Sequence, residues 1–224
     1  MVTSDYRYER KFVTSELSKY HVESIVKTHP AIFSEIYQLR NVNNMYFDSF
    51  RLVNYSDNVD GSSDRIKIRI RWYGELFGKI KNPVLEIKEK KGMLGRKISI
   101  PISPFTLLNN TDIRDIIKSL DHFRDVVLID FKSLIPTLLN RYSRKYYQSY
   151  DKNFRITIDD KQEFYSIGTK NNLFLEKYRD DNSVIIELKY DRDFEKRANN
   201  ITSCFPFRVS KNSKYVNGLD KIYQ

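Results

Sequence analysis

Residues 65–73 read Arg-Ile-Lys-Ile-Arg-Ile-Arg-Trp-Tyr, and the fold that we expect is built outward from this stretch. Basic and apolar side chains alternate along it, and successive side chains of a β-strand point to opposite faces. The four basic side chains therefore share one face, and the isoleucines and Trp72 share the other. A single strand of this kind usually turns its charged face to water. The alternative is that the charged face lines a cavity.

Other stretches repeat the pattern of a charged face opposite an apolar one, namely residues 85–90 (LEIKEK), 154–159 (FRITID) and 184–190 (VIIELKY). Like charges on one strand face lie roughly 7 Å apart. Each such pair repels by about 0.6 kcal/mol in bulk water, and by about 2.4 kcal/mol at an effective dielectric constant near 20. In an enclosed cavity, carboxylates or a bound anion would have to offset this repulsion. Glu86 and Glu187 can offset part of the repulsion, and the excess of cations indicates that a bound anion offsets the rest.

The composition favours one folded domain, residues 1–224, with a polyanionic partner. Aromatic residues make up 14% of the 224 residues, which is enough to bury a core and excludes wholesale disorder. The chain has 39 Lys and Arg against 29 Asp and Glu, a net charge of +10. Such a charge suits nucleic acid, phosphate chains or an anionic membrane surface.

Several functional classes are excluded by what the sequence lacks. Cys204 is the single cysteine, so neither an internal disulfide nor a cysteine-based zinc site can form. The three histidines have no ligand spacing, so any metal should be a hard cation held by carboxylates. No Walker A motif is present, so side chains must cradle any phosphate. No apolar stretch reaches about 18 residues and the N-terminus lacks an apolar signal core, which leads us to expect a soluble, cytoplasmic protein.

Hydrophobic periodicity predicts an antiparallel sheet or barrel with few crossover helices. We expect strands at residues 6–13, 42–48, 63–73, 84–90, 96–100, 138–150, 154–159, 162–166 and 183–190. We expect helices at residues 14–27, 191–199 and 211–223, with Thr14 capping the first, and a mostly helical pattern over residues 105–134.

Eight short motifs, taken in order, resemble a known family. They are YERKF at 8–12, YFD at 46–48, RIRWYG at 69–74, EIK at 86–88, YSR at 142–144, RITID at 155–159, ELKY at 187–190 and SKYVNG at 213–218. The series resembles the VTC domain, the catalytic domain of the vacuolar transporter chaperone polyphosphate polymerases, within the triphosphate tunnel metalloenzyme group. The resemblance extends over about residues 5–220, and RIRWYG and the C-terminal KNSKYVNG are its most specific parts.

The resemblance implies an α+β fold that is mainly antiparallel β: a closed tunnel barrel of eight strands with a polar, basic interior and helices packed outside. It implies a polyphosphate polymerase that transfers the γ-phosphoryl group of ATP to a growing polyphosphate chain in the tunnel, with Mn²⁺ or Mg²⁺. Two alternatives stay open: a metal-dependent tripolyphosphatase or nucleotide-processing tunnel enzyme, and a non-catalytic module that binds polyphosphate or nucleic acid. A membrane channel that takes up the chain would be a separate protein, and would place this one at the inner face of a membrane.

The resemblance also assigns roles by position. It assigns phosphoryl transfer to Arg69, Arg71, Lys88, Arg144 and Arg155, phosphate binding to Lys11, Lys97, Tyr142, Lys189, Lys211 and Lys214, and metal binding to Glu187. Lys211 and Lys214 are expected on one face of the last helix.

Two assignments stay open between alternatives. Glu9 and Glu86 either contact the metal or orient the neighbouring lysines. Only one of Arg96 and Lys97 can point inward on a regular strand. We favour Lys97, because Ser99 then shares its face and the two neighbouring isoleucines are free for packing.

Overall fold

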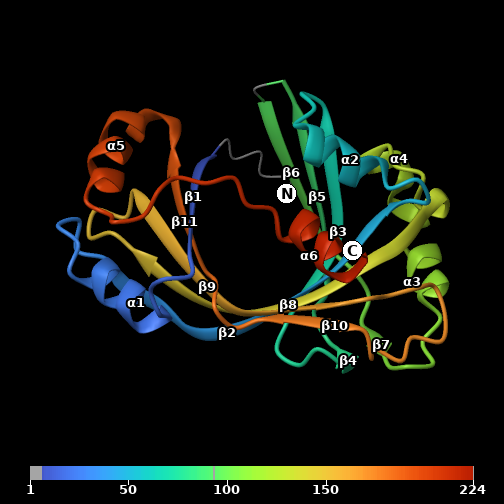
Figure 1. Cartoon of the computed structure of the whole chain (residues 1–224). Coiled ribbons are helices and arrows are strands. Elements are labelled where there is room, and N and C mark those ends of the chain that lie inside the picture. The colour runs from blue at the N-terminus through green and yellow to red at the C-terminus, as the bar shows by residue number, and fades with distance from the viewer. Residues whose placement is uncertain (1–6, 93, 224) are drawn as a thin grey trace.

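The computed structural model describes residues 7–92 and 94–223, and its centre is one large antiparallel sheet (Figure 1). The strands follow the order β1-β11-β9-β8-β2-β3-β5-β6, and β10 pairs with β9. Their bounds are β1 (Arg7–Thr14), β2 (Ser34–Ser49), β3 (Arg65–Tyr73), β5 (Val84–Lys91), β6 (Leu94–Pro101), β8 (Leu134–Gln148), β9 (Phe154–Tyr165), β10 (Lys177–Asp180) and β11 (Val184–Asp191). In Figure 1, β1 and β11 stand on one side and β3, β5 and β6 on the other, with β9, β8 and β2 crossing beneath them.

The expected eight-stranded antiparallel architecture is confirmed, but the sheet is not closed by hydrogen bonds. β1 and β6 stand at the two ends of the strand order. The free edge of β1 is covered by the segment that leads from α5 to α6 (Figure 1). In this contact the Ser210 amide donates to the Lys11 carbonyl over 2.8 Å, and Phe12 forms an isolated antiparallel bridge with Val209.

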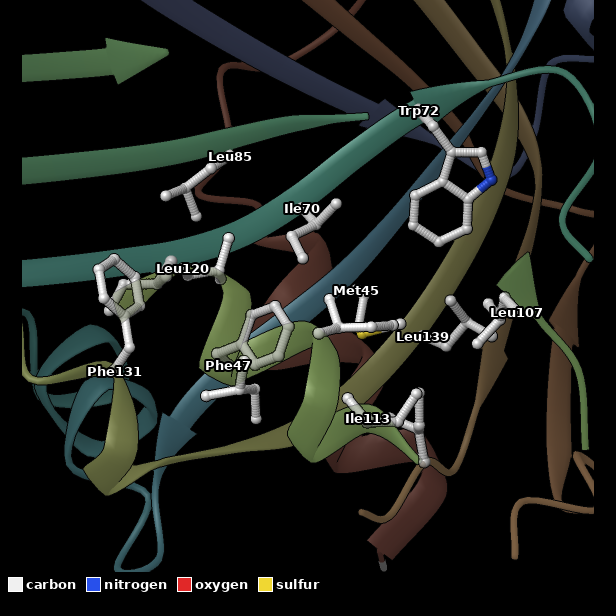
Figure 2. Close-up of a cluster of buried hydrophobic side chains, with 14 of the residues drawn as sticks. Met45, Phe47, Ile70, Trp72, Leu85, Leu107, Ile113, Leu120, Phe131 and Leu139 are labelled. Carbon is white, nitrogen blue, oxygen red and sulfur yellow. The ribbon is translucent and has the colours of Figure 1, made fainter. Parts of the chain in front are cut away.

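The expected sidedness of the strands is confirmed by β3. Ile68, Ile70 and Trp72 are buried in the main apolar cluster. Figure 2 shows this cluster between strands of the sheet and the helical segment that follows β7. A second cluster packs the other part of the sheet against α1 and α5. The apolar faces of the strands thus look outward, under helices, and the charged faces look inward.

The helices and the short sheet have the following bounds: α1 (Lys19–Lys27), α2 (Val53–Asp60), α3 (Ile113–Ser119), α4 (Arg124–Val127), α5 (Glu195–Ser203), α6 (Lys214–Tyr223), the 3-10 turns η1 (Asp121–Phe123), η2 (Phe131–Ser133) and η3 (Arg192–Phe194), and the strand pair β4 (Gly78–Ile80) and β7 (Phe105–Leu107). The mostly helical pattern expected over 105–134 is found as the short helices α3, η1, α4 and η2, but the segment starts with the strand β7. The sequence also gave no sign of α2, β4 or β10.

Two expected helix starts were also wrong. Thr14 is the last residue of β1, paired with Val184, and α1 is capped by Ser18, whose hydroxyl accepts from the His21 amide. The C-terminal helix begins at Lys214, so Lys211 does not share a helical face with it. Sequence patterns place helix ends poorly, because one residue can suit both a strand end and a cap.

Helix α6 approaches the sheet closely because Gly218 has no side chain. A Cβ atom at this position would lie 2.6 Å from Cδ1 of Phe164 and would also clash with Leu138. Tyr215, on the same helix, donates its hydroxyl to Asp48 over 2.6 Å and stacks on Tyr46 with 5.0 Å between ring centroids. These contacts fix the first turn of α6, and with it Lys214, against the inner face of the sheet.

Candidate functional site

A cavity of about 1520 Å³ lies inside the curled sheet. All eight strands of the main order, together with the start of α6, contribute to its wall. Lysine and arginine side chains of the wall far outnumber its glutamates. The charged strand faces therefore converge on one shared space, as the alternation of residues 65–73 requires if its basic face is to line a cavity.

Most residues that the resemblance singled out lie together in this wall. They are Lys11, Arg69, Arg71, Lys88, Lys97, Tyr142, Arg144, Arg155, Glu187, Lys189 and Lys214. Lys211 lies apart from them: it is exposed, it precedes α6, and it is not among the residues that line the cavity. Lys67, to which no role was assigned, lines the cavity with the others.

One ion cluster is centred on Glu86, which is buried on β5. Its carboxylate lies 2.6 Å from Nη2 of Arg69, 2.7 Å from Nζ of Lys97 and 3.4 Å from Nη1 of Arg71. Burial by itself raises the pKa of Glu86, but the charges of Arg69 and Arg71 outweigh it and hold this pKa well below its usual value. Glu86 thus stays ionised and holds basic side chains of β3 and β6. Lys97 points inward, as the alternation favoured, but the exposed Arg96 next to it also lines the cavity.

The other ion cluster is centred on Glu187, which is buried on β11. Its carboxylate lies 3.0 Å from Nζ of Lys189, 3.3 Å from Nη2 of Arg144 and 3.6 Å from Nζ of Lys11. Burial opposes its charge, yet these cations, led by Lys189, keep the pKa of Glu187 well below normal. The adjacent Asp159 is fully buried and binds Nε and Nη2 of Arg144, at 2.5 and 2.6 Å.

Tyr142 lies between the two clusters. Nη2 of Arg71 donates to its hydroxyl over 3.3 Å, and Nζ of Lys214 lies 4.7 Å from the centre of its ring. Burial raises the pKa of Tyr142, but the charges of Arg144 and Arg71 reverse the shift and leave this pKa below its ordinary value. The buried Tyr142 ring thus accepts a hydrogen bond from Arg71 through its hydroxyl, while the charged groups of Arg144 and Lys214 lie over its face.

Three lysines form a row across the sheet. Lys67 of β3 pairs with Lys88 of β5, which pairs with Lys97 of β6. Like charges directly opposite one another are destabilising. Lys97 has Glu86 as a partner, whereas neither Lys67 nor Lys88 has a carboxylate within 4 Å in the described part of the chain. Within the described residues, the charges of Lys67 and Lys88 are thus not compensated by an ion pair, and an anion in the cavity would supply the compensation.

The protonation of Lys67 gives a prediction about pH. Burial and the charges of Lys11, Arg65 and Arg69 together lower its pKa to about 7, against the opposing effect of Glu9. Its Nζ donates to Oγ of Ser213 over 2.9 Å. A bound polyanion favours the charged form and raises this pKa, so binding takes up a proton above pH 7. We expect the affinity for tripolyphosphate, measured by calorimetry without metal, to fall between pH 7 and 8.5, by up to about tenfold per unit. Below pH 7 Lys67 is already largely charged, so it should not make the tripolyphosphate affinity depend on pH there.

The matched control for this pH effect is Lys67→Met, which removes the titrating group. Its affinity should be lower at pH 7 and nearly constant up to pH 8.5. An equal slope in both proteins would contradict the role of Lys67.

The carboxylates of the cavity fit a divalent ion that arrives with phosphate. Glu9 and Glu187 both line the cavity. Burial and the charge of Glu187 raise the pKa of Glu9, but the neighbouring lysines, led by Lys11, outweigh them and leave this pKa below its ordinary value. Within residues 7–92 and 94–223 no group of three or more acidic, histidine or cysteine side chains could hold a metal by itself. Mg²⁺ commonly takes one or two carboxylates and completes its shell with phosphate oxygens and water. The carboxylates of Glu9 and Glu187 suit this kind of coordination.

Comparison with known proteins gives one family match and several similar folds. The family model described as the VTC domain matches residues 6–223. No curated protein matches the sequence. No helix in the described residues is both long and apolar enough to cross a membrane.

Three solved structures illustrate the shared fold. A candidate adenylate cyclase of Bacillus halodurans has a TM-score of 0.57 at 13% identity, over 95% of this chain and 97% of that one. A protein of Pyrococcus horikoshii has a TM-score of 0.51 at 14% identity, over 96% and 99%. A candidate adenylyl cyclase of Hippeastrum, described as having a dominant triphosphatase activity, has a TM-score of 0.52 at 15% identity, over 92% of each chain. Identities this low establish a common fold and nothing finer.

Proposed function

Because the chain belongs to the VTC domain family, we propose that it is an ATP-dependent polyphosphate polymerase, which transfers the γ-phosphoryl group of ATP to a growing chain of inorganic polyphosphate. The observation that carries the proposal is the cavity wall: every strand of the main order contributes to it, and its cations exceed its carboxylates. A polyanion as long as a phosphate chain would meet positive charge along the whole cavity.

The residues present suit phosphoryl transfer. This reaction needs little covalent chemistry from the protein; it needs in-line positioning and neutralisation of charge on the phosphoryl oxygens. Arg69 and Arg71 on β3 and Arg144 on β8, two strands away in the sheet, offer planar donors that bind phosphate oxygens in pairs. Glu86 and Asp159 hold Arg69 and Arg144 in place, so these guanidinium groups are preorganised before substrate enters.

Lysines extend the positive wall beyond the arginines. Lys67 and Lys88 have no internal counter-ion in the described chain and are free to hold a phosphate chain as point charges. We assign Glu187 and Glu9 to the divalent metal, Mn²⁺ or Mg²⁺, which when bound would add neutralising charge to the phosphate oxygens. Glu86 serves instead as the internal partner of Arg69 and Lys97.

A triphosphatase of the same fold is the second candidate. It is favoured by the similarity to the Hippeastrum protein, whose described activity is that of a triphosphatase. The same wall would bind the triphosphate of the substrate, and water instead of a phosphate chain would then receive the γ-phosphoryl group.

The test is incubation of the protein with ATP and Mn²⁺, followed by gel sizing of the phosphate product. The polymerase yields a ladder of acid-labile phosphate chains and an equal release of ADP per phosphate added. Release of inorganic phosphate without chains would reject the polymerase and favour the triphosphatase. Formation of cyclic AMP would indicate a cyclase. Binding of polyphosphate without any turnover would reduce the protein to a binding module.

A further inference from the structure

Four side chains with stacking surfaces gather in one part of the cavity wall: Tyr37 and Arg40 of β2, Tyr73 of β3 and Tyr146 of β8. Cζ of Arg40 lies 4.3 Å from the ring centroid of Tyr37, and 5.6 Å from those of both Tyr73 and Tyr146. The rings of Tyr37 and Tyr146 meet edge to face with their centroids 5.5 Å apart. Among the described residues, no ion pair within 4 Å accounts for the position of Arg40 in this cluster.

The backbone of β2 departs from regular geometry to form it. Along β8 the partners step from Tyr147 to Tyr146 to Arg144, while along β2 they step from Glu35 to Tyr37 to Arg40. Each step inserts one extra residue into β2, which is the signature of a β-bulge. Residues three apart on a regular strand face opposite sides of the sheet. Because of the bulges, Tyr37 and Arg40 both reach the cavity.

Two of the four side chains, Tyr37 and Tyr73, are well exposed, and Arg40 and Tyr146 are half-buried. Tyr37 is 47% exposed and Tyr73 is 51% exposed, whereas Tyr142, deeper in the same cavity, is 1% exposed. Arg40 has no carboxylate within 4 Å in the described part of the chain. Aromatic rings and guanidinium planes of this kind stack on nucleobases. An inorganic phosphate chain has no planar group that could use them.

The cluster stands next to the phosphate-binding wall. Arg40 is the direct cross-strand partner of Arg144. Tyr146 follows Arg144 by two residues on β8, which is roughly 7 Å along a strand and leaves both side chains on the same face. A ligand whose phosphates contact Arg144 would therefore bring the group attached to those phosphates to the tyrosines.

We propose that Tyr37, Arg40, Tyr73 and Tyr146 form the subsite for the base of a nucleoside triphosphate, with the base stacked on the open faces of Tyr37 and Arg40. This inference rests on the proposed function, since it names the part of the cavity that receives the nucleoside of ATP. The cluster makes the cavity bind a nucleotide more tightly than an inorganic triphosphate, and it sets the end of the cavity at which the nucleotide lies.

The experiment compares two ligands on matched variants. Dissociation constants for the β,γ-imido analogue of ATP and for inorganic tripolyphosphate are measured by calorimetry at one Mg²⁺ concentration. Tyr37→Ala is expected to weaken the nucleotide about tenfold, which is within the effect of losing one base-stacking ring, and to leave tripolyphosphate within about twofold. Tyr37→Phe keeps the ring and should restore nucleotide binding. Tyr20→Ala, at an exposed position of α1 away from the cavity, is the control for loss of a surface tyrosine.

The outcomes separate this inference from the proposed function. Equal losses for both ligands, or no loss for either, would overturn the base subsite while the phosphate site stands. A selective loss of nucleotide binding together with no polymer in the ATP assay would support the subsite and reject the polymerase. Failure of the unsubstituted protein to bind either ligand would reject both.

Discussion

Glu187→Gln is expected to abolish metal-dependent turnover while polyphosphate still binds. The substitution keeps the size of the side chain and one oxygen that accepts from Arg144, but it removes the negative charge that a divalent ion needs. We expect the rate of product formation from ATP and Mn²⁺ to fall by about 10²–10³-fold, the effect of losing one charge-stabilising group. Without metal, the affinity for polyphosphate should rise about fivefold, because one repulsive charge near 4 Å is worth about 1 kcal/mol in water.

The control for this prediction is Glu89→Gln. Glu89 also lines the cavity and undergoes the same chemical change, but it takes part in no ion pair within 4 Å in the described chain. It should keep most of the turnover. If Glu187→Gln left turnover intact, the metal assignment would fail. If it lost polyphosphate affinity as well, the carboxylate would be holding the site together through Lys189 and Arg144, and a lowered melting temperature would show this.

The inner wall of the cavity could be predicted from the sequence because strand geometry fixes it. A period of two leaves no freedom: once Ile68 and Ile70 are assigned to a core, Lys67 and Arg69 must face the other way. The same argument selected Lys97 over Arg96, and the structure places Nζ of Lys97 at 2.7 Å from Glu86. What alternation could not tell is whether the charged faces would meet in a cavity or face bulk water.

Alternation could not predict that Tyr37 and Arg40 share the cavity wall. Tyr37 and Arg40 reach the wall through bulges in β2, and a bulge breaks the period of two on which the prediction depends. Nor could the open edges of β1 and β6 be predicted, since backbone pairing between distant strands leaves no local signal in either one. The helical pattern over residues 105–134 did not show where one short helix ends and the next begins, because short helices around a shared core keep an apolar spacing close to that of one long helix.

Our second large effect concerns two arginines of the same wall that should respond in opposite ways. Arg144 is buried and bound to Asp159 and Glu187, whereas Arg155 is exposed to the cavity and has no carboxylate within 4 Å in the described residues. Arg144→Met removes one partner of a buried ion pair, which typically costs 3–5 kcal/mol. In a chain of this length we expect a fall in melting temperature of about 6–20 °C. Arg155→Met should leave the melting temperature unchanged, or raise it as repulsion with Lys189 is relieved.

Arg155→Met should instead show its effect in the affinity for tripolyphosphate. Because Arg155 pairs with no carboxylate in the described residues, its charge is available to the ligand. Loss of a charged hydrogen bond worth about 1.5–3 kcal/mol should weaken tripolyphosphate binding by about 10- to 150-fold in Arg155→Met. Calorimetry and thermal unfolding on the two variants thus separate a cation that also stabilises the fold, Arg144, from one that serves the ligand alone, Arg155. Equal destabilisation by both substitutions would mean that the wall is only a structural ion network, and an unchanged affinity in Arg155→Met would remove that side chain from the phosphate site.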